Sequence, residues 1–148
     1  MLSKKAQYAL KALSELVTNN SKTPVLIKDI AEKKGIPLKF LENILLELKK
    51  AGILDSKKGK NGGYFLREAP EKTTLAQIVR LMDGPIALLP CVSLYFYERC
   101  SDCDEQNCDI HRIFAEVRDR TLEVLENTTL RDIHQKRLSH SPNLVNYE

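Results

Sequence analysis

The stretch IKDIAEKKGIPLKFLENILLELKK, residues 27–50, decides the fold. Apolar residues recur in it at helical spacing, first over 27–34 and then over 37–50. Between the two runs, Gly35 suits the left-handed position that follows a helix, and Pro37 begins the next helix. Two short helices joined in this way have the layout of a helix-turn-helix, whose second helix enters the major groove of DNA.

Segments on both sides of this stretch predict a mainly helical chain. Ser3 caps a helix that runs to about residue 18, and residues 53–55 and 64–66 read as two short strands around a glycine-rich turn. A capping box that begins at Thr74 starts a fourth helix. A long helix is expected over about 109–127, with apolar residues at nearly heptad spacing that need a partner. The predicted fold class is therefore mainly α with a small β-hairpin wing, a winged helix-turn-helix plus a long C-terminal dimerisation helix.

Four segments follow from these elements. Residues 1–84 form a winged helix-turn-helix DNA-binding domain, 85–108 a cysteine-containing sensor segment, 109–134 the dimerisation helix and its end, and 135–148 a flexible tail. The tail is expected to be flexible because it is polar and contains Pro142.

Charge is distributed unevenly along the chain. Residues 1–67 carry 14 Lys and Arg against 6 Asp and Glu, whereas residues 68–148 carry 9 against 14. A basic half indicates a polyanionic partner. No apolar run is long enough to span a membrane and no secretory signal pattern is visible, so we expect a cytoplasmic protein without a membrane partner. The chain also lacks a paired nucleophile and base, which argues against an enzyme.

The candidate DNA interface combines the second helix with the hairpin. Lys39 can bond guanine or phosphate, Glu42 can accept from cytosine, and Asn43 can bond adenine. Phe40 either touches a thymine methyl group or belongs to the core. Glycines let the backbone of the hairpin approach DNA, and its lysines supply charge for phosphate. The candidate DNA-binding residues are Lys28, Pro37, Lys39, Phe40, Glu42, Asn43, Lys57, Lys58, Gly59, Lys60, Asn61 and Gly62.

All four cysteines lie within 18 residues, in the spacing Cys91-x8-Cys100-x2-Cys103-x4-Cys108-x2-His111. Thiolates are soft ligands that suit zinc or an iron–sulfur cluster. A structural zinc site needs four closed ligands, a redox switch needs only two neighbouring thiols, and an iron–sulfur cluster needs three or four thiolates, with His or a carboxylate completing the set. Five acidic residues in 91–111 also favour bound cations. His111 is either a ligand or a solvated residue in the first turn of its helix.

With the wing and the cysteines together, the chain resembles the Rrf2 family of bacterial transcription regulators. This family includes an iron–sulfur cluster regulator, a nitric oxide sensor and a regulator of cysteine metabolism. The resemblance covers most of residues 1–132. It is carried by the motifs LSKKAQYA at 2–9, IAEKKGI at 30–36, FLE at 40–42, KGKNGGY at 58–64 and NTTL at 127–130.

The resemblance implies a homodimer whose long helices pair, palindromic promoter DNA as the target, and a cluster near the junction of the dimerisation helix and the DNA-binding domain. It matches Lys39, Phe40, Glu42 and Asn43 to base-reading residues and Lys58, Gly59 and Lys60 to wing contacts. Among the ligands, it matches Cys91 and Cys108 to the first and third cysteines of the family's cluster binders, Cys103 by proximity to the middle one, and His111 to the histidine ligand, with Cys100 extra.

These matches lead to a specific functional hypothesis. The chain is expected to be a regulator, with repression the expected direction, whose promoter affinity depends on a 2Fe–2S or 4Fe–4S cluster or on zinc. A change in the order of residues 91–108 would then alter the spacing of two recognition helices, which read half-sites about 34 Å apart. The alternative is a cluster-free regulator controlled by thiol oxidation or a protein partner, with or without structural zinc.

Overall fold

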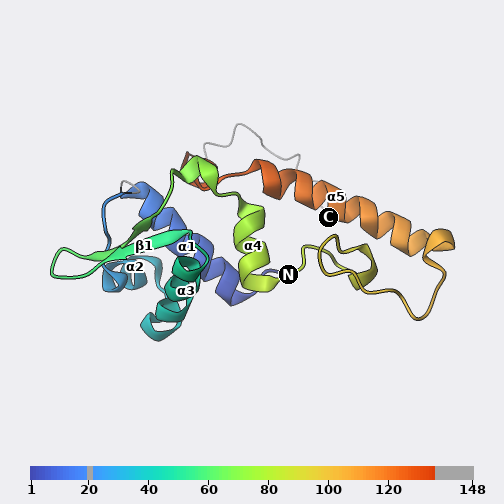
Figure 1. Ribbon diagram of the computed structural model, residues 1–148, viewed down its shortest axis with the longest axis horizontal. Helices are drawn as coiled ribbons and strands as arrows, with labels where there is room; N and C mark the ends of the chain where they lie inside the picture. The colour runs from blue at the N-terminus through green and yellow to red at the C-terminus, as the bar shows by residue number, and fades with distance from the viewer. Residues whose placement is uncertain (20–21, 136–148) are drawn as a thin grey trace, which may run out of the picture.

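The computed structural model describes residues 1–19 and 22–135 (Figure 1). The expectation of a flexible tail lies, from residue 136 onward, outside the described residues. The structure has six α-helices and one two-stranded antiparallel hairpin within the described part of the chain, which confirms the mainly helical winged-helix fold class. The elements are α1 (Lys4–Thr18), α2 (Ile27–Lys34), α3 (Leu38–Lys50), β1 (Leu54–Lys57), β2 (Gly63–Leu66), α4 (Leu75–Asp83), α5 (Asp109–Asn127) and α6 (Leu130–Gln135), with short 3₁₀ turns at Pro70–Lys72, Pro90–Val92 and Glu105–Asn107.

The core of the molecule forms around α1. One face of this helix is fully buried, and α2, α3, α4, α6 and β2 all pack against it. The face begins with Ala6, Ala9 and Ala12, whose small side chains let neighbouring helices approach closely, and ends with Leu13 and Leu16. We refer to α1–α4, the hairpin and α6 together as the head. Burial of apolar surface stabilises a fold by about 25 cal/mol per Å², so the packing of other elements against this face contributes to the stability of the head.

The paired part of the hairpin extends further from the core, toward its turn, than the sequence indicated. Leu54 pairs with Leu66 at the buried end, and the ladder continues outward through polar residues to Lys57 opposite Gly63. Apolar residues mark only the buried end of a strand, so the expected strands at 53–55 and 64–66 missed this outer part. Gly63, at φ 140°, also approaches the backbone of Val25 so closely that a Cβ would lie 2.2 Å from its carbonyl oxygen.

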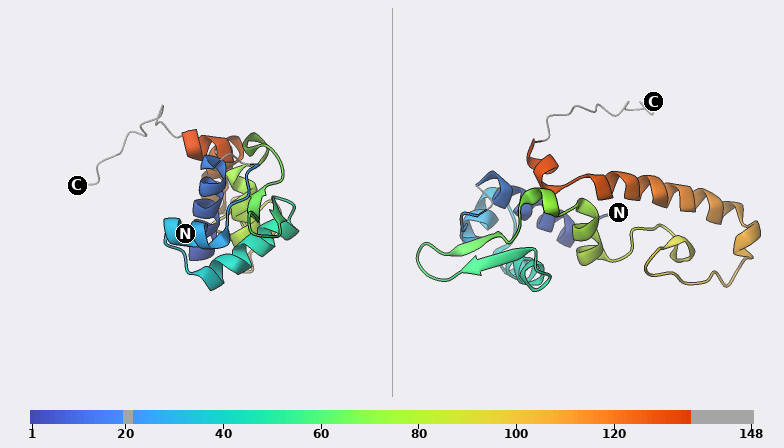
Figure 2. Two further views of the ribbon diagram at one scale, coloured as in Figure 1. Left: turned by 90° about the vertical axis from the view of Figure 1, so that its left-hand side faces the viewer. Right: turned by 45° about the horizontal axis from the view of Figure 1, so that its top comes forward.

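The long helix α5 extends away from the head, and residues 85–108 run out beneath it to its far, N-terminal end (Figures 1 and 2). Leu122 is the one residue of α5 that is buried. Its outward residues Ile110, Ile113, Val117 and Val124, here called the apolar seam, are between 38% and 63% exposed. No helix in the described part of the chain is long and apolar enough to cross a membrane.

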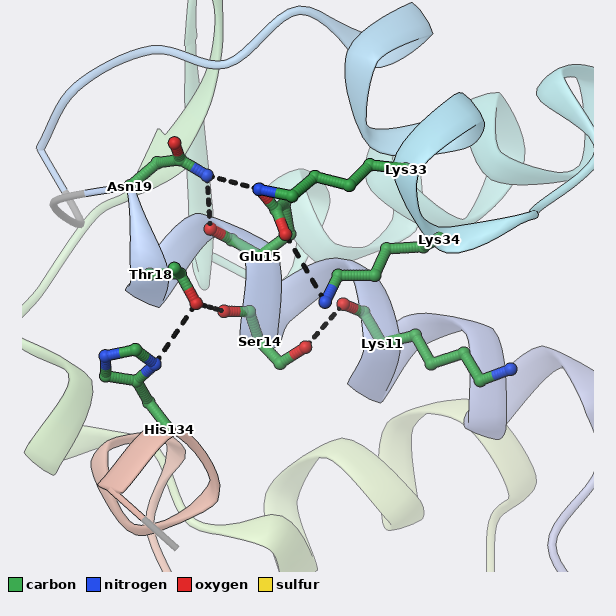
Figure 3. Close-up of polar contacts among 8 residues, drawn as sticks. All are labelled: Lys11, Ser14, Glu15, Thr18, Asn19, Lys33, Lys34 and His134. Carbon is green, nitrogen blue, oxygen red and sulfur yellow. Dashed lines mark hydrogen bonds and ion pairs between the residues drawn. The ribbon is translucent and has the colours of Figure 1, made fainter.

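A short helix that the sequence analysis did not separate from α5 returns the chain to the head. The backbones of Thr74 and Thr129 form an isolated bridge, after which α6 begins at the fully buried Leu130. His134 Nδ1 of α6 then lies 3.1 Å from Thr18 Oγ1 of α1 (Figure 3). The C-terminal end of α5 is therefore tied to the same helix that supports α2 and α3.

A buried carboxylate fixes α2 against α1. The side chain of Glu15 is 3% exposed, and it lies 2.5 Å from Lys33 Nζ and 3.3 Å from Lys34 Nζ, at the C-terminal end of α2 (Figure 3). Burial alone would raise the pKa of Glu15. Hydrogen bonds from Lys33, Asn19 and Lys34 together outweigh burial and hold this pKa below its usual 4.5.

Replacing Glu15 with Gln is expected to lower the free energy of unfolding at pH 7 by about 1–3 kcal/mol, because two lysines lose a buried charged partner. A carboxylate with a lowered pKa stabilises the folded state above its unfolded pKa and loses that effect as pH falls through its folded pKa. The difference between parent and variant, measured by urea unfolding, should therefore shrink below about pH 4.5. The control Glu32→Gln changes an exposed residue of α2 and should shift stability by less than about 0.5 kcal/mol. Equal losses in the two variants would contradict the role of Glu15.

Candidate nucleic-acid interface and cysteine cavity

The outward face of α3 carries the residues that the sequence analysis selected for base contact. Pro37, Lys39, Phe40, Glu42 and Asn43 are all exposed. The inward face packs into the core through Leu41, Ile44, Leu45 and Leu48. The side chain of Lys39 is 90% exposed, and its Nζ lies 3.3 Å from Glu42 Oε2, so one residue's donor and the other's acceptor share the same edge of the helix.

Phe40 combines the two roles left open by the sequence. Its ring packs edge-on against Tyr8 of α1, with centroids 5.7 Å apart and an 80° angle between the planes, while 39% of the residue remains exposed. Lys11 Nζ lies 5.9 Å from the centroid of the Tyr8 ring. The sequence analysis did not identify Tyr8 and Lys11 as neighbours of the candidate DNA-contacting face. The signal for their contact with each other was their spacing of three residues, which places two side chains on one face of a helix.

The turn of the hairpin projects beyond the helices of the head (Figure 1). Lys57, Lys58, Gly59, Lys60 and Asn61 are exposed there, as is Lys28 on α2. Gly62 is buried instead, and a Cβ at this position would lie 2.1 Å from the carbonyl oxygen of Lys57. Gly62 thus allows the close backbone contacts of a tight turn. Gly59, at φ 108°, adopts a backbone conformation that favours glycine.

All four cysteines and His111 line one open cavity of about 490 Å³. Each cysteine is partly exposed and none forms a disulfide. The cavity is lined by residues of the segment before α5 and of the first turn of α5. This N-terminal end of α5 lies away from the head of the same chain (Figures 1 and 2). The family resemblance had implied a site near the junction of the long helix and the DNA-binding domain, and within one chain the structure places the cysteines at the opposite end of that helix.

Three of the thiols, Cys100, Cys103 and Cys108, influence one another's pKa at the start of α5. Hydrogen bonds with Cys100 first, and with Cys108 second, raise the pKa of Cys103 to about 12. Cys108 caps α5, because its Sγ accepts a hydrogen bond from the backbone N–H of His111 at 3.4 Å. That N–H is the main cause that lowers the pKa of Cys108.

The fourth thiol belongs to a different group of donors. One ligand atom from each of Cys91, Glu105 and His111 lies within 4.8 Å of the other two. The Glu105 carboxylate accepts hydrogen bonds from the backbone N–H of Cys100 at 2.8 Å and from the Tyr97 hydroxyl at 2.9 Å. The first of these bonds is the main cause that lowers the pKa of Glu105. Burial, followed by the charge of Glu105, raises the pKa of Cys91.

Glu105 was not among the residues predicted as ligands, although the acidity of residues 91–111 was the signal that contained it. His111 has a further property that the sequence does not reveal. Among residues 1–19 and 22–135, its Nδ1 is the buried side-chain nitrogen or oxygen atom that has no hydrogen-bond partner. Buried polar atoms are nearly always paired, so an unpaired imidazole nitrogen beside a thiol and a carboxylate is suited to a cation. This donor set therefore fits a metal ion, and the four thiols that line the cavity also suit an iron–sulfur cluster.

Comparison with known proteins agrees with this architecture. Residues 2–136 match the Rrf2 family, described as "Iron-dependent Transcriptional regulator". The chain is 44% identical to an rrf2-like HTH-type transcriptional regulator of Rhodobacter capsulatus over 137 residues, which cover 90% of this chain and 91% of that protein. The solved structure of CymR, the global cysteine regulator of B. subtilis, has a TM-score of 0.77 and 29% identity, covering 91% of this chain and 96% of the other. That of T. potens IscR has a TM-score of 0.71 and 27% identity, covering 91% and 86%.

Substitutions on α3 and on the wing should affect DNA binding differently. Lys39→Ala is expected to relax base preference, because a donor to guanine is lost, with about 1–3 kcal/mol less discrimination at one base pair. Lys60→Ala should weaken binding to specific and random duplexes alike and flatten the dependence on salt by about one phosphate contact. Titrations of both duplexes over a range of salt concentrations measure these effects. Equal losses on specific and random DNA from both variants would show that α3 is not the base-reading helix.

Proposed function

Because this chain belongs to the Rrf2 family of transcriptional regulators, we propose that it binds promoter DNA as a dimer and that a metal ion or iron–sulfur cluster in the cysteine cavity sets its affinity. Its relatives are transcriptional regulators rather than enzymes, and DNA is their partner. The observation that carries the proposal is the convergence of four cysteines and His111 on one cavity.

DNA contact is assigned to two elements of the head. The N-terminal part of α3 offers Lys39, Glu42 and Asn43 to base edges, since all three are exposed and point away from the core. The turn of the hairpin offers Lys57, Lys58 and Lys60 to phosphates on either side. Lys28 adds a further positive charge on α2. The residues of α3 would thus read the bases, and the lysines of the hairpin and of α2 would position the protein on the phosphate backbone of the DNA.

Dimerisation is supported by the uncovered surface of α5. The apolar seam of Ile110, Ile113, Val117 and Val124 is exposed along the helix. Beside it lies an apolar groove of about 770 Å³ between α4, residues 85–88, the N-terminal end of α1 and α5. A second copy of the chain would cover both surfaces through a self-complementary contact with two-fold symmetry. Such a dimer matches palindromic DNA, because its two copies of α3 are related by the same symmetry.

Regulation is assigned to the sensor segment, residues 85–108, with the first turn of α5. Cys91, Cys100, Cys103, Cys108 and His111 are the residues that would hold a metal or cluster, and the bound group would supply a cross-link whose charge and stability depend on metal supply or redox state. The segment joins α4 to α5 directly, and its 3₁₀ turn Pro90–Val92 packs against α5. A change in its order therefore alters how α5 is held relative to the head.

A cluster-free thiol switch is the second candidate, and the proximity of Cys103 to Cys100 and Cys108 favours it. Neighbouring thiols can form a disulfide after local movement. Formation of that bond releases two protons and two electrons to an oxidant such as a peroxide. The backbone N–H of His111 lowers the pKa of Cys108 and so favours its thiolate, which is the form of a thiol that reacts with a peroxide.

Alanine substitutions at the cysteines distinguish these candidates. Anaerobically purified protein is expected to contain zinc, or iron with matching sulfide. Cys91→Ala should remove the dependence of DNA affinity on either bound group, whereas Cys103→Ala and Cys108→Ala should remove the dependence on an iron–sulfur cluster, which needs three or four thiolates. The measurement is metal and sulfide analysis together with DNA titration before and after chelation. The control Ser101→Ala lies on the same cavity wall and should leave the response unchanged. A metal-free protein whose DNA affinity responds only to peroxide would establish the thiol switch instead.

Charges on the apolar seam should separate the dimer into monomers. Ile113→Asp or Val124→Asp would place an unpaired charge in the proposed interface, at a cost of several kcal/mol per dimer, since each change occurs twice. The dimer dissociation constant should therefore rise by about 100-fold or more, as measured by light scattering over a range of concentrations. Glu123→Lys, on an exposed part of α5 away from the seam, is the matched control and should leave the mass unchanged. A dimer of unchanged affinity in both seam variants would place the interface elsewhere.

A further inference from the structure

The four thiols, Glu105 and His111 fall into two groups. Cys100, Cys103 and Cys108 line the same cavity, with Cys103 beside the other two thiols. Cys91, Glu105 and His111 instead converge, with one ligand atom of each within 4.8 Å of the others. We refer to the second group as the mixed triad. It offers one sulfur, one oxygen and one nitrogen ligand, which come from the 3₁₀ turns Pro90–Val92 and Glu105–Asn107 and from the first turn of α5.

We propose that the mixed triad of Cys91, Glu105 and His111 binds a single divalent transition-metal ion, with Glu105 as a direct ligand and the other three cysteines outside the coordination sphere. The inference rests on the proposed function of the cavity as a metal-dependent sensor, and it specifies the ligands and the class of ion. Zinc and ferrous iron both accept thiolate, imidazole and carboxylate together.

The spacing of the donors suits one ion. Four-coordinate zinc bonds sulfur at about 2.3 Å and nitrogen or oxygen at about 2.0–2.2 Å, which places tetrahedral ligand atoms roughly 3.4–3.6 Å apart. Ligand atoms that already lie within 4.8 Å need to close by only about 1 Å. The three side chains leave the fourth position open for water or an exchangeable ligand, as suits a site that gains and loses its ion.

The unpaired nitrogen of His111 is an independent indication of a ligand. Its Nδ1 is buried, and no group among residues 1–19 and 22–135 donates to it or accepts from it. Leaving a buried polar atom unpaired costs about 1–3 kcal/mol, a cost that coordination to a cation removes. The backbone N–H of His111 meanwhile donates to Cys108 Sγ and fixes the start of α5, where His111 lines the cavity.

Glu105 links the mixed triad to the rest of the sensor segment. One carboxylate oxygen accepts from the Tyr97 hydroxyl and the other from the N–H of Cys100. A metal bound by this carboxylate competes with those two hydrogen bonds. Residues 97–100 therefore change their contacts whenever Glu105 becomes a ligand, so occupation of the triad alters the order of the segment between α4 and α5.

Cobalt substitution tests the ligand set directly. Co²⁺ is titrated anaerobically into metal-free protein, and the sulfur-to-cobalt charge-transfer absorption is measured, since its intensity grows with the number of thiolates. The triad predicts the intensity of one thiolate. Cys91→Ser should abolish the band, whereas Cys103→Ser should retain it. Glu105→Gln should weaken Co²⁺ binding at least about tenfold, and competition with Zn²⁺ or Fe²⁺ should show the same loss.

Glu98→Gln is the matched control, because it makes the same change at an exposed carboxylate on the wall of the same cavity and should leave the affinity unchanged. An intensity of three or four thiolates, loss of the band in Cys103→Ser, or full affinity in Glu105→Gln would each overturn the mixed triad. Circular dichroism of each metal-free variant confirms that the fold is intact. DNA titration with and without Zn²⁺ tests the proposed function separately. Binding through the triad without any change in DNA affinity would support the metal site and overturn the regulatory proposal.

Discussion

Burial of one face of α1 is the constraint on which the rest of the structure depends. Five elements of the head pack against this helix, and its alanines allow them to lie close. The orientation of α3, and thus of the outward Lys39 and Asn43, follows from how Leu41 and Leu45 fit against it. Glu15 restricts the position of α2 against α1. Its buried carboxylate forms ion pairs with Lys33 and Lys34 at the end of α2, and few other positions of that helix would keep both pairs. Apolar contacts bring the helices together, and the buried charge selects one arrangement among those that would bury similar area.

The sensor segment and α5 have the opposite character. The head encloses its own core, whereas α5 buries only Leu122 and leaves its apolar seam uncovered. Residues 85–108 are held largely by short turns and by hydrogen bonds to polar side chains such as Glu105. Segments with few buried apolar contacts open at low free energy, so small binding energies can change their order. Ligand binding can therefore change the order of the weakly held sensor segment while the stable head keeps the structure of the DNA-reading surface.

Much of the fold could be predicted from sequence because periodic apolar patterns span whole helices. The bounds of α1, α2 and α5 agree with the prediction to within about a residue. The outer half of the hairpin was missed because Ser56 and Lys57 pair through backbone rather than through apolar side chains. The break before α6 depends on the bridge between Thr74 and Thr129, a contact between residues far apart in the chain. The clustering of the cysteines was visible in their spacing, but that spacing carried no information about which donors face one another, so the sequence could not separate the thiol group from the mixed triad or identify Glu105.

The division of the cavity has an energetic consequence for what it binds. Using the thiol of Cys103 as a ligand requires the loss of its proton, and the neighbouring thiols Cys100 and Cys108 oppose this loss because they raise the pKa of Cys103 to about 12. His111 Nδ1 has no hydrogen bond to lose in the described chain. A first metal ion therefore meets the smaller barrier at His111, Glu105 and Cys91. A group that recruits the remaining thiols must provide enough binding energy to displace three protons and reorganise residues 100–108, which makes full occupation of the cavity depend on a ligand as strongly bound as an iron–sulfur cluster.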